Sequence, residues 1–167
     1  MTTSIALWLR RLASPRRTPV PGRGRQAAAL LLRLTCAALL AWIGYLHLHL
    51  WLEGYRQIPT DGPLFLLDAV AGLALAVLLL LWAAPLTGLA AAGYTVSTLA
   101  ALLISLSVGL FGFRESIAAS YVTQSLAIET ITVLTLLSWT ALVTATPTRR
   151  GLPVRHRSPA PQASRGR

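Results

Sequence analysis

The sequence carries little charge, little sulfur and none of the common catalytic motifs. Only 12% of its 167 residues are charged, against about 25% in a typical soluble domain. The single cysteine, Cys36, excludes an intramolecular disulfide and a cysteine-based metal site. No Walker loop, H-E-x-x-H or G-x-S-x-G sequence occurs. We therefore expect a protein that is not an enzyme, with no catalytic, cofactor-binding or metal-binding residue.

Lysine is also absent, and the arginines are concentrated near the two ends of the sequence. Six arginines lie within residues 1–26 and six more follow Pro147, whereas all five acidic residues lie between these segments. Nucleic-acid binding is one interpretation of the net charge of +10. It is disfavoured because the segments show neither interleaved aromatic residues nor a folded motif. Residues 1–26 and 147–167 are instead predicted to be disordered basic tails.

Long apolar runs are what the sequence has in abundance, since 54% of its residues are hydrophobic. Four runs, 34–51, 63–84, 86–111 and 117–145, each supply about the 20 helical residues that cross a bilayer. The strands of a β-barrel would be shorter and would alternate in polarity. Small residues four apart, Gly72 with Ala76 and Gly88 with Ala92, indicate helix-packing faces. We expect an all-α, integral membrane, four-helix up-down bundle over residues 27–146.

The arginine distribution also predicts an orientation. Four spans place both ends of the chain on one side of the membrane, and arginine-rich segments favour the cytoplasmic side. We therefore expect a multi-pass protein of the cell membrane with both termini in the cytoplasm. The connections 53–62 and 112–120 then lie outside.

Polar side chains gather where these outer connections meet the apolar runs. Residues 47–68 read HLHLWLEGYRQIPTDGPLFLLD, and at about 1.5 Å per helical residue the intramembrane acids and histidines all fall in the outer third. A charged carboxylate in hydrocarbon costs about 2.5–3.5 kcal/mol. We expect His47 or His49 to approach Asp68 or Glu129, with Arg56 or Arg114 covering these acids. The candidate polar cluster comprises His47, His49, Glu53, Arg56, Asp68, Arg114, Glu115 and Glu129.

Helical spacing gives local expectations for the same stretch. If the first helix continues to about Arg56, then His49, Glu53 and Arg56 share one face. His47 and His49 point about 200° apart on a helix, so they do not ligate one metal ion. Trp51 and Tyr55 are interpreted as an aromatic belt at the outer interface, in preference to a ligand-stacking role. Asp61 is expected to cap the second helix or brace the turn before it.

Two classes of function are compatible with these features. The leading interpretation is a structural or accessory membrane subunit, whose polar cluster organises the bundle or docks a partner. The alternative is a proton-coupled transporter, or a binder of a small ligand or cation, that uses Asp68 and Glu129. The expected partners are the lipid bilayer together with another membrane protein or further copies of this chain.

Two strings, HLHLWLEGYRQIPTDGPLFLLDAVAGL and GLFGFRES, resemble parts of small, uncharacterised four-span membrane proteins of GC-rich bacteria. The resemblance covers about residues 39–145 and excludes both arginine-rich ends. It implies a four-helix integral membrane protein. It implies no activity, substrate or cofactor, and no functional residue follows from it.

Overall fold

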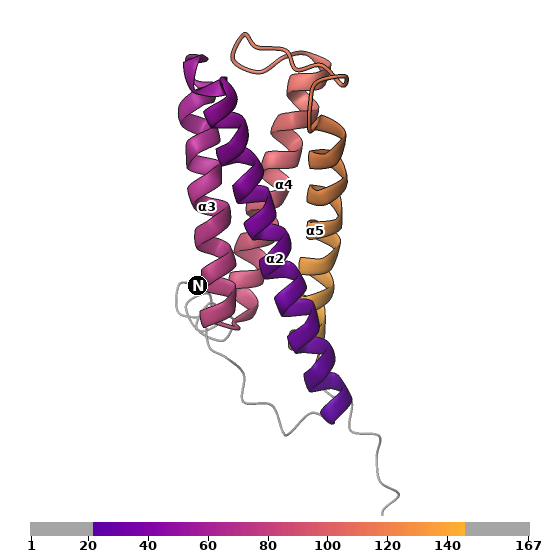
Figure 1. Ribbon diagram of the computed structural model, residues 1–167. Helices are drawn as coiled ribbons and strands as arrows, with labels where there is room; N and C mark the ends of the chain where they lie inside the picture. Colours follow the sequence, from indigo (N-terminus) through magenta and orange to yellow (C-terminus); the bar gives the residue numbers. More distant parts are fainter. Residues whose placement is uncertain (1–21, 146–167) are drawn as a thin grey trace, which may run out of the picture.

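The computed structural model describes residues 22–145, which form four long helices and no strand. The helices are α2 (Arg23–Glu53), α3 (Asp61–Leu81), α4 (Pro85–Ser107) and α5 (Val122–Thr144), with a 3-10 turn, η1 (Tyr55–Gln57), between the first two. Figure 1 shows the helices side by side, with η1 and residues 108–121 at one end and residues 82–84 at the other. We call the first the loop end and the second the arginine end.

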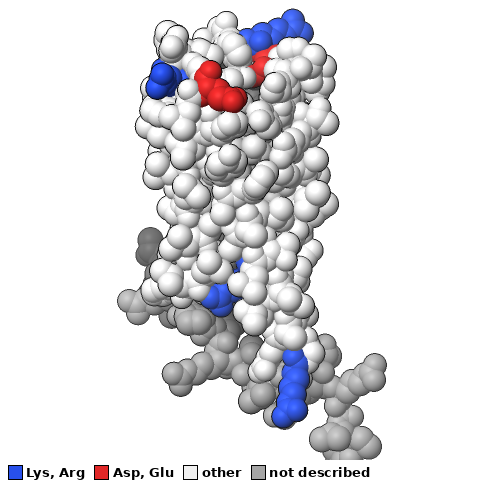
Figure 2. All heavy atoms as spheres, in the orientation of Figure 1, with Lys and Arg blue, Asp and Glu red and all other residues white. Residues whose placement is uncertain are grey.

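All four helices are long and apolar enough to cross a membrane, as the sequence predicts. Leucine, valine and isoleucine side chains are exposed along the outside of the bundle. Figure 2 shows acidic and basic side chains near the loop end, arginines alone toward the opposite end, and a broad uncharged band between them. This distribution matches a hydrocarbon layer with charged boundaries.

The helix bounds differ from the expected ones in three places. The first helix already begins at Arg23, so residues 23–26 are helical although the sequence predicts a tail up to residue 26. It ends at Glu53 because Gly54 adopts a φ of 150°, a backbone conformation that favours glycine. The connection between α4 and α5 covers residues 108–121, whereas the sequence predicts a connection over 112–120. The other residues of the two predicted tails lie outside the described residues.

Glycines let the helices approach closely. A Cβ atom on Gly44 would lie 2.9 Å from the carbonyl oxygen of Ala69, and one on Gly72 would lie 3.1 Å from the Cα atom of Gly44. On α4, a Cβ atom on Gly88 would lie 2.7 Å from the Trp139 ring. The packing roles predicted for Gly72 and Gly88 are therefore confirmed, with α2 against α3 and α4 against α5.

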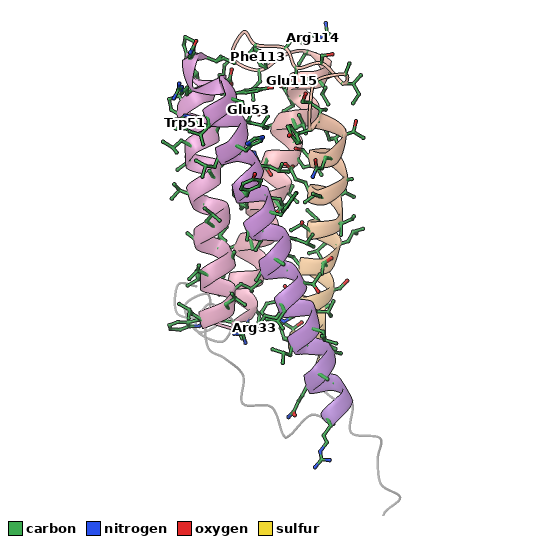
Figure 3. The ribbon with its side chains drawn as sticks, in the orientation of Figure 1. Arg33, Trp51, Glu53, Phe113, Arg114 and Glu115 are labelled. Atoms are coloured by element: carbon green, nitrogen blue, oxygen red, sulfur yellow. The ribbon has the colours of Figure 1, made fainter. Side chains whose placement is uncertain are left out.

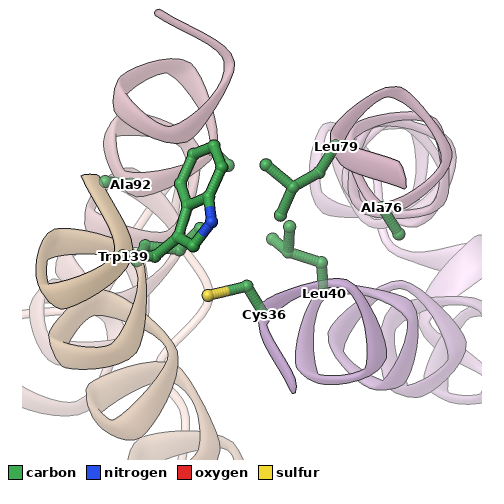
Figure 4. Close-up of a cluster of buried hydrophobic side chains, with 8 residues drawn as sticks. Cys36, Leu40, Ala76, Leu79, Ala92 and Trp139 are labelled. Carbon is green, nitrogen blue, oxygen red and sulfur yellow. The ribbon is translucent and has the colours of Figure 1, made fainter. Parts of the chain in front are cut away.

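A dry apolar cluster fills the bundle toward the arginine end. Figure 4 shows side chains from all four helices converging there. The cluster contains Cys36, Leu40, Ala76, Leu79, Ala91, Ala92, Leu136 and Trp139, all almost fully buried. The hydroxyls of Thr132 and Thr135 on α5 return to carbonyl oxygens one turn earlier, so they add no polar path through this half.

Two arginine side chains donate hydrogen bonds to the C-terminal carbonyl groups of neighbouring helices at the arginine end. The Arg25 guanidinium donates to the carbonyl oxygens of Leu142 and Ala145, where α5 ends. The Arg33 guanidinium donates to the carbonyl oxygen of Leu80, in the last turn of α3. Positive charge at a helix C-terminus stabilises both the free carbonyls and the helix dipole. These contacts tie the start of α2 to its neighbours.

Candidate functional site

A cavity lined by both polar and apolar side chains lies inside the loop end of the bundle. Its volume is about 90 Å³ measured over the centres of water molecules, which is room for several waters. Helices α2, α3, α4 and α5, the turn η1 and the connection 108–121 all contribute to its wall. Its titratable or aromatic lining residues are His47, Tyr55, Asp61, Phe65, Asp68, Phe113, Glu115 and Glu129.

Three carboxyl groups from helices α3 and α5 line this cavity, in addition to Glu115 from the connection 108–121. Asp61 and Asp68 are seven residues apart on α3 and therefore share one face. Glu129 comes from α5 and is 2% exposed. Asp61 is 6% exposed, and its Oδ2 atom has no hydrogen-bond partner among the described residues. Such a buried, unsatisfied acceptor is costly unless water or a ligand reaches it.

Glu129 is held by a threonine pair on α4. The Thr98 hydroxyl lies 3.1 Å from Glu129 Oε2 and 3.0 Å from the carbonyl oxygen of Thr95. One hydroxyl hydrogen serves both acceptors, so Thr98 fixes the position of Glu129 without satisfying it fully. The Glu129 carboxyl group remains able to take part in a further interaction inside the cavity.

A lid made of Tyr55 and residues 109–116 lies over the cavity at the loop end. The Tyr55 hydroxyl donates a 2.7 Å hydrogen bond to Glu115 Oε2, and the Ser116 amide donates to Glu115 Oε1. The Glu115 amide in turn donates to Ser105 on α4. Burial, together with the hydrogen bond and the negative charge of Glu115, raises the pKa of the Tyr55 phenol above its ordinary value. The phenol therefore stays protonated and remains a donor.

A glycine and three residues with positive φ angles shape the backbone around the lid. A Cβ atom on Gly62 would lie 2.9 Å from the carbonyl oxygens of Tyr55 and Arg56, so only glycine lets η1 rest on the first turn of α3. Thr60, Phe111 and Tyr121 have positive φ angles, which are uncommon outside glycine. All three lie in the connections at the loop end, where strained backbone accompanies the cavity.

The two histidines of the predicted cluster have different surroundings. His47 lines the cavity together with Asp68 and Glu129, and its ring centroid lies 5.4 Å from that of Phe65. His49 instead lies 3.2 Å from Glu53 and contacts the Tyr45 and Tyr121 rings. The expected approach of one histidine to the acids thus falls to His47.

The arginines differ from the expectation. Neither Arg56 nor Arg114 lines the cavity, and no ion pair to either is found within residues 22–145. Both side chains are exposed, and Figure 3 shows Arg114 at the tip of the loop end. Arg56 does not share a face with Glu53 because α2 has already ended at Gly54. The cavity is consequently acidic, with no arginine to neutralise it.

Two further residues have roles that the sequence interpretation assigned differently. Tyr55 does not belong to a lipid-facing belt, because it packs 4.6 Å from Phe65 and bonds to Glu115. Asp61 is the first residue of α3, after the N-cap residue Thr60, and it lines the cavity. A signal for Asp61 was present in the sequence, namely its seven-residue spacing from Asp68. No comparable signal existed for Tyr55.

No protein-family model, curated protein or solved structure matches this chain. The geometry of the cavity therefore carries the functional argument.

Proposed function

We propose that this protein is an integral membrane, up-down four-helix bundle with both termini in the cytoplasm. The four apolar helices and the uncharged band between charged ends support this placement. The cavity then opens toward the outside of the cell. Single cysteines at positions 57 and 114, with Cys36 replaced, are expected to react with a membrane-impermeant maleimide added outside intact cells. Labelling of these cysteines only by maleimide supplied from the cytoplasmic side would contradict the proposed orientation.

Within that membrane protein, the cavity functions as a binding site for a small cation. The single observation that carries this proposal is the convergence of Asp61, Asp68 and Glu129 in one enclosed space that no arginine lines. A buried carboxylate oxygen without a donor, such as Asp61 Oδ2, is costly in a low-dielectric surrounding, and enclosing walls of low dielectric strengthen the attraction of the carboxylates for positive charge. A bound cation offsets that cost.

Binding is favoured over transport. Alternating access requires a site near the bilayer midplane, whereas the cluster around Cys36, Leu40 and Trp139 closes the other half of the bundle. The cavity therefore does not continue through the bundle to the arginine end. The proposal is therefore for a binding protein and not for a transporter, and it assigns no catalytic residue.

The test is cation-dependent stabilisation. A ligand that binds only the folded protein raises its apparent stability. Purified protein in phosphatidylcholine nanodiscs is heated at constant ionic strength with sodium, calcium or butylammonium chloride, and unfolding is followed by tryptophan fluorescence. At least one cation is expected to raise the unfolding temperature of the wild type but not of the Asp68→Asn, Glu129→Gln double variant.

A matched control is Glu53→Gln, which removes a carboxylate at the loop end but outside the cavity. This variant is expected to respond to the cation as the wild type does. Equal responses of the wild type and the cavity double variant would contradict the proposal, as would no response to any cation.

An accessory-subunit role is the second candidate. The apolar cluster that fills the bundle toward the arginine end favours this role, because a subunit that only organises a complex needs no path across the membrane. It predicts that none of the cations changes the unfolding temperature. It also predicts that extraction in mild detergent yields a complex of fixed stoichiometry instead of a lone chain.

A further inference from the structure

We infer that the cation held in this cavity is the primary ammonium group of a small amine. The inference rests on the proposed function and specifies the ligand class. It combines three observations: an aromatic wall beside the acids, a volume too large for one ion, and a buried carboxylate oxygen, Asp61 Oδ2, without a donor. The first two favour an amine over an inorganic cation, and the third favours a primary over a quaternary ammonium.

The aromatic wall consists of Tyr55, Phe65, Phe113 and His47. The Tyr55 ring centroid lies 4.6 Å from that of Phe65 and 5.9 Å from that of Phe113, and His47 lies 5.4 Å from Phe65. Phe65 shares the face of α3 with Asp61 and Asp68, because it lies four residues after one and three before the other. Aromatic faces attract organic cations within about 6 Å. The α3 helix thus presents negative charge and aromatic surface to the same space.

The size of the cavity favours a ligand with a carbon skeleton. A volume of about 90 Å³ over water centres has room for several water-sized atoms, whereas a bare ion fills about one such position. Leu50, Ala101 and Leu102 line the cavity as well and offer contacts to hydrocarbon. Within residues 22–145, no three His, Cys, Asp or Glu side chains are close enough together to chelate a metal ion.

The unsatisfied acceptors favour a primary over a quaternary ammonium. Asp61 Oδ2 is buried with no donor, and Glu129 shares the one hydroxyl hydrogen of Thr98 with a backbone carbonyl. A primary ammonium brings three N–H donors on one positive atom. It therefore supplies a hydrogen bond to Asp61 Oδ2 and has further donors for other acceptors of the lining, while its carbon chain packs against the aromatic wall.

The same ammonium chemistry exists in free amines and in the headgroup of phosphatidylethanolamine. Both present a primary ammonium to the loop end, so lipid composition has to be controlled. Nanodiscs of phosphatidylcholine alone contain no lipid with a primary amine. Nanodiscs with added phosphatidylethanolamine contain such a lipid in both leaflets. A free amine binds in nanodiscs of phosphatidylcholine alone. In nanodiscs with phosphatidylethanolamine, the free amine has to compete with the lipid if the lipid headgroup reaches the cavity.

The experiment is calorimetric titration of the full-length protein in phosphatidylcholine nanodiscs with butylammonium, tetramethylammonium, sodium, calcium and the neutral analogue 1-butanol. Butylammonium is expected to bind most tightly and butanol not measurably. Asp61→Asn is expected to weaken butylammonium about tenfold or more, because one charge-assisted hydrogen bond is lost. Phe65→Leu is expected to weaken it a few-fold through the lost cation–π contact, while leaving sodium unaffected.

Matched controls are Glu53→Gln and Phe111→Leu, both at the loop end and outside the cavity lining. Circular dichroism and unfolding temperature establish that each variant is folded before titration. Weaker butylammonium binding in nanodiscs with phosphatidylethanolamine than in those without it identifies the lipid as a source. Unchanged affinity identifies free amines as the ligand.

The outcomes separate the two proposals. If sodium or calcium binds in an Asp61-dependent way and butylammonium does not, the amine inference is wrong and the cation-binding proposal stands. If butanol binds as tightly as butylammonium, the cavity recognises apolar shape and both proposals are wrong. If no cation binds, both are wrong as well.

Discussion

Replacing Tyr55 with phenylalanine isolates the hydrogen bond that closes the lid. The change removes the 2.7 Å bond from the phenol to Glu115 and leaves the ring contacts with Phe65 and Phe113 in place. A hydrogen bond to a charged group contributes about 1.5–3 kcal/mol net. Because Tyr55 and Glu115 are only partly buried, we expect a loss near the lower bound. At about 1.4 kcal/mol per factor of ten, the equilibrium constant for opening the lid rises roughly tenfold.

Hydrogen exchange of the lid amides measures this constant. The amides of Leu110 and Phe113 donate to each other's carbonyl oxygens at 2.7 and 2.8 Å, and the Glu115 amide donates to the Ser105 carbonyl. Exchange at these amides is expected to accelerate about tenfold in Tyr55→Phe, in step with the opening constant, whereas amides in the middle of α5 keep their rates.

Tyr45→Phe is the control for that measurement. Tyr45 is 50% exposed, and its ring stacks on His49 outside the cavity, so the variant is expected to exchange like the wild type. Lid amides that exchange at wild-type rates in Tyr55→Phe would refute the assignment of Tyr55 as the residue that holds the lid closed.

Three further results are expected. Gly44→Ala forces a methyl group against the backbone of α3 and is expected to lower the free energy of unfolding in mixed SDS micelles by about 1–3 kcal/mol. Gly93→Ala, which meets nothing within 4 Å, is expected to be neutral or to stabilise by up to about 1 kcal/mol, and an equal loss in both variants would contradict the packing argument. The phenol of Tyr55, whose pKa is raised in the folded protein, is expected to titrate above the ordinary value of about 10 in a ¹³C NMR experiment. Its contribution to stability is then complete below about pH 10 and is lost as the pH rises through the raised value; titration at or below the ordinary value would contradict this. Arg25→Met removes the donors to the end of α5 and is expected to accelerate exchange at residues 142–145, where unchanged exchange would show that the arginine does not hold this end.

The four helices could be predicted from the sequence because the length of an apolar run is sufficient evidence for a membrane-crossing helix. The position where α2 ends also had a signal, since Gly54 stands just after the last helical residue and glycine commonly ends helices. The expectation that α2 continues to Arg56 passed over that glycine. It consequently placed Arg56 on the face of Glu53, although the chain turns between them.

The composition of the site was only partly predictable. Depth along a helix brings His47, Asp68 and Glu129 to one level, and the structure places all three around one cavity. The arginines could not be placed in this way, because Arg56 and Arg114 lie in connections whose path depends on long-range contacts and on unusual backbone angles such as that of Phe111. Nothing local in the sequence indicates that Tyr55 turns inward to reach Glu115, which lies 60 residues later.

The apolar cluster around Cys36, Leu40 and Trp139 has an electrical consequence for a membrane protein of this kind. A full unit charge crossing a membrane potential of 100 mV gains or loses about 2.3 kcal/mol. In the proposed orientation, opening of the lid admits water and brings the outer potential into the cavity, so that the voltage falls mainly across the apolar cluster toward the arginine end. A cation bound there, as proposed, would then experience a smaller fraction of the membrane potential than one at the bilayer midplane, and its affinity would depend less on whether the cell is energised.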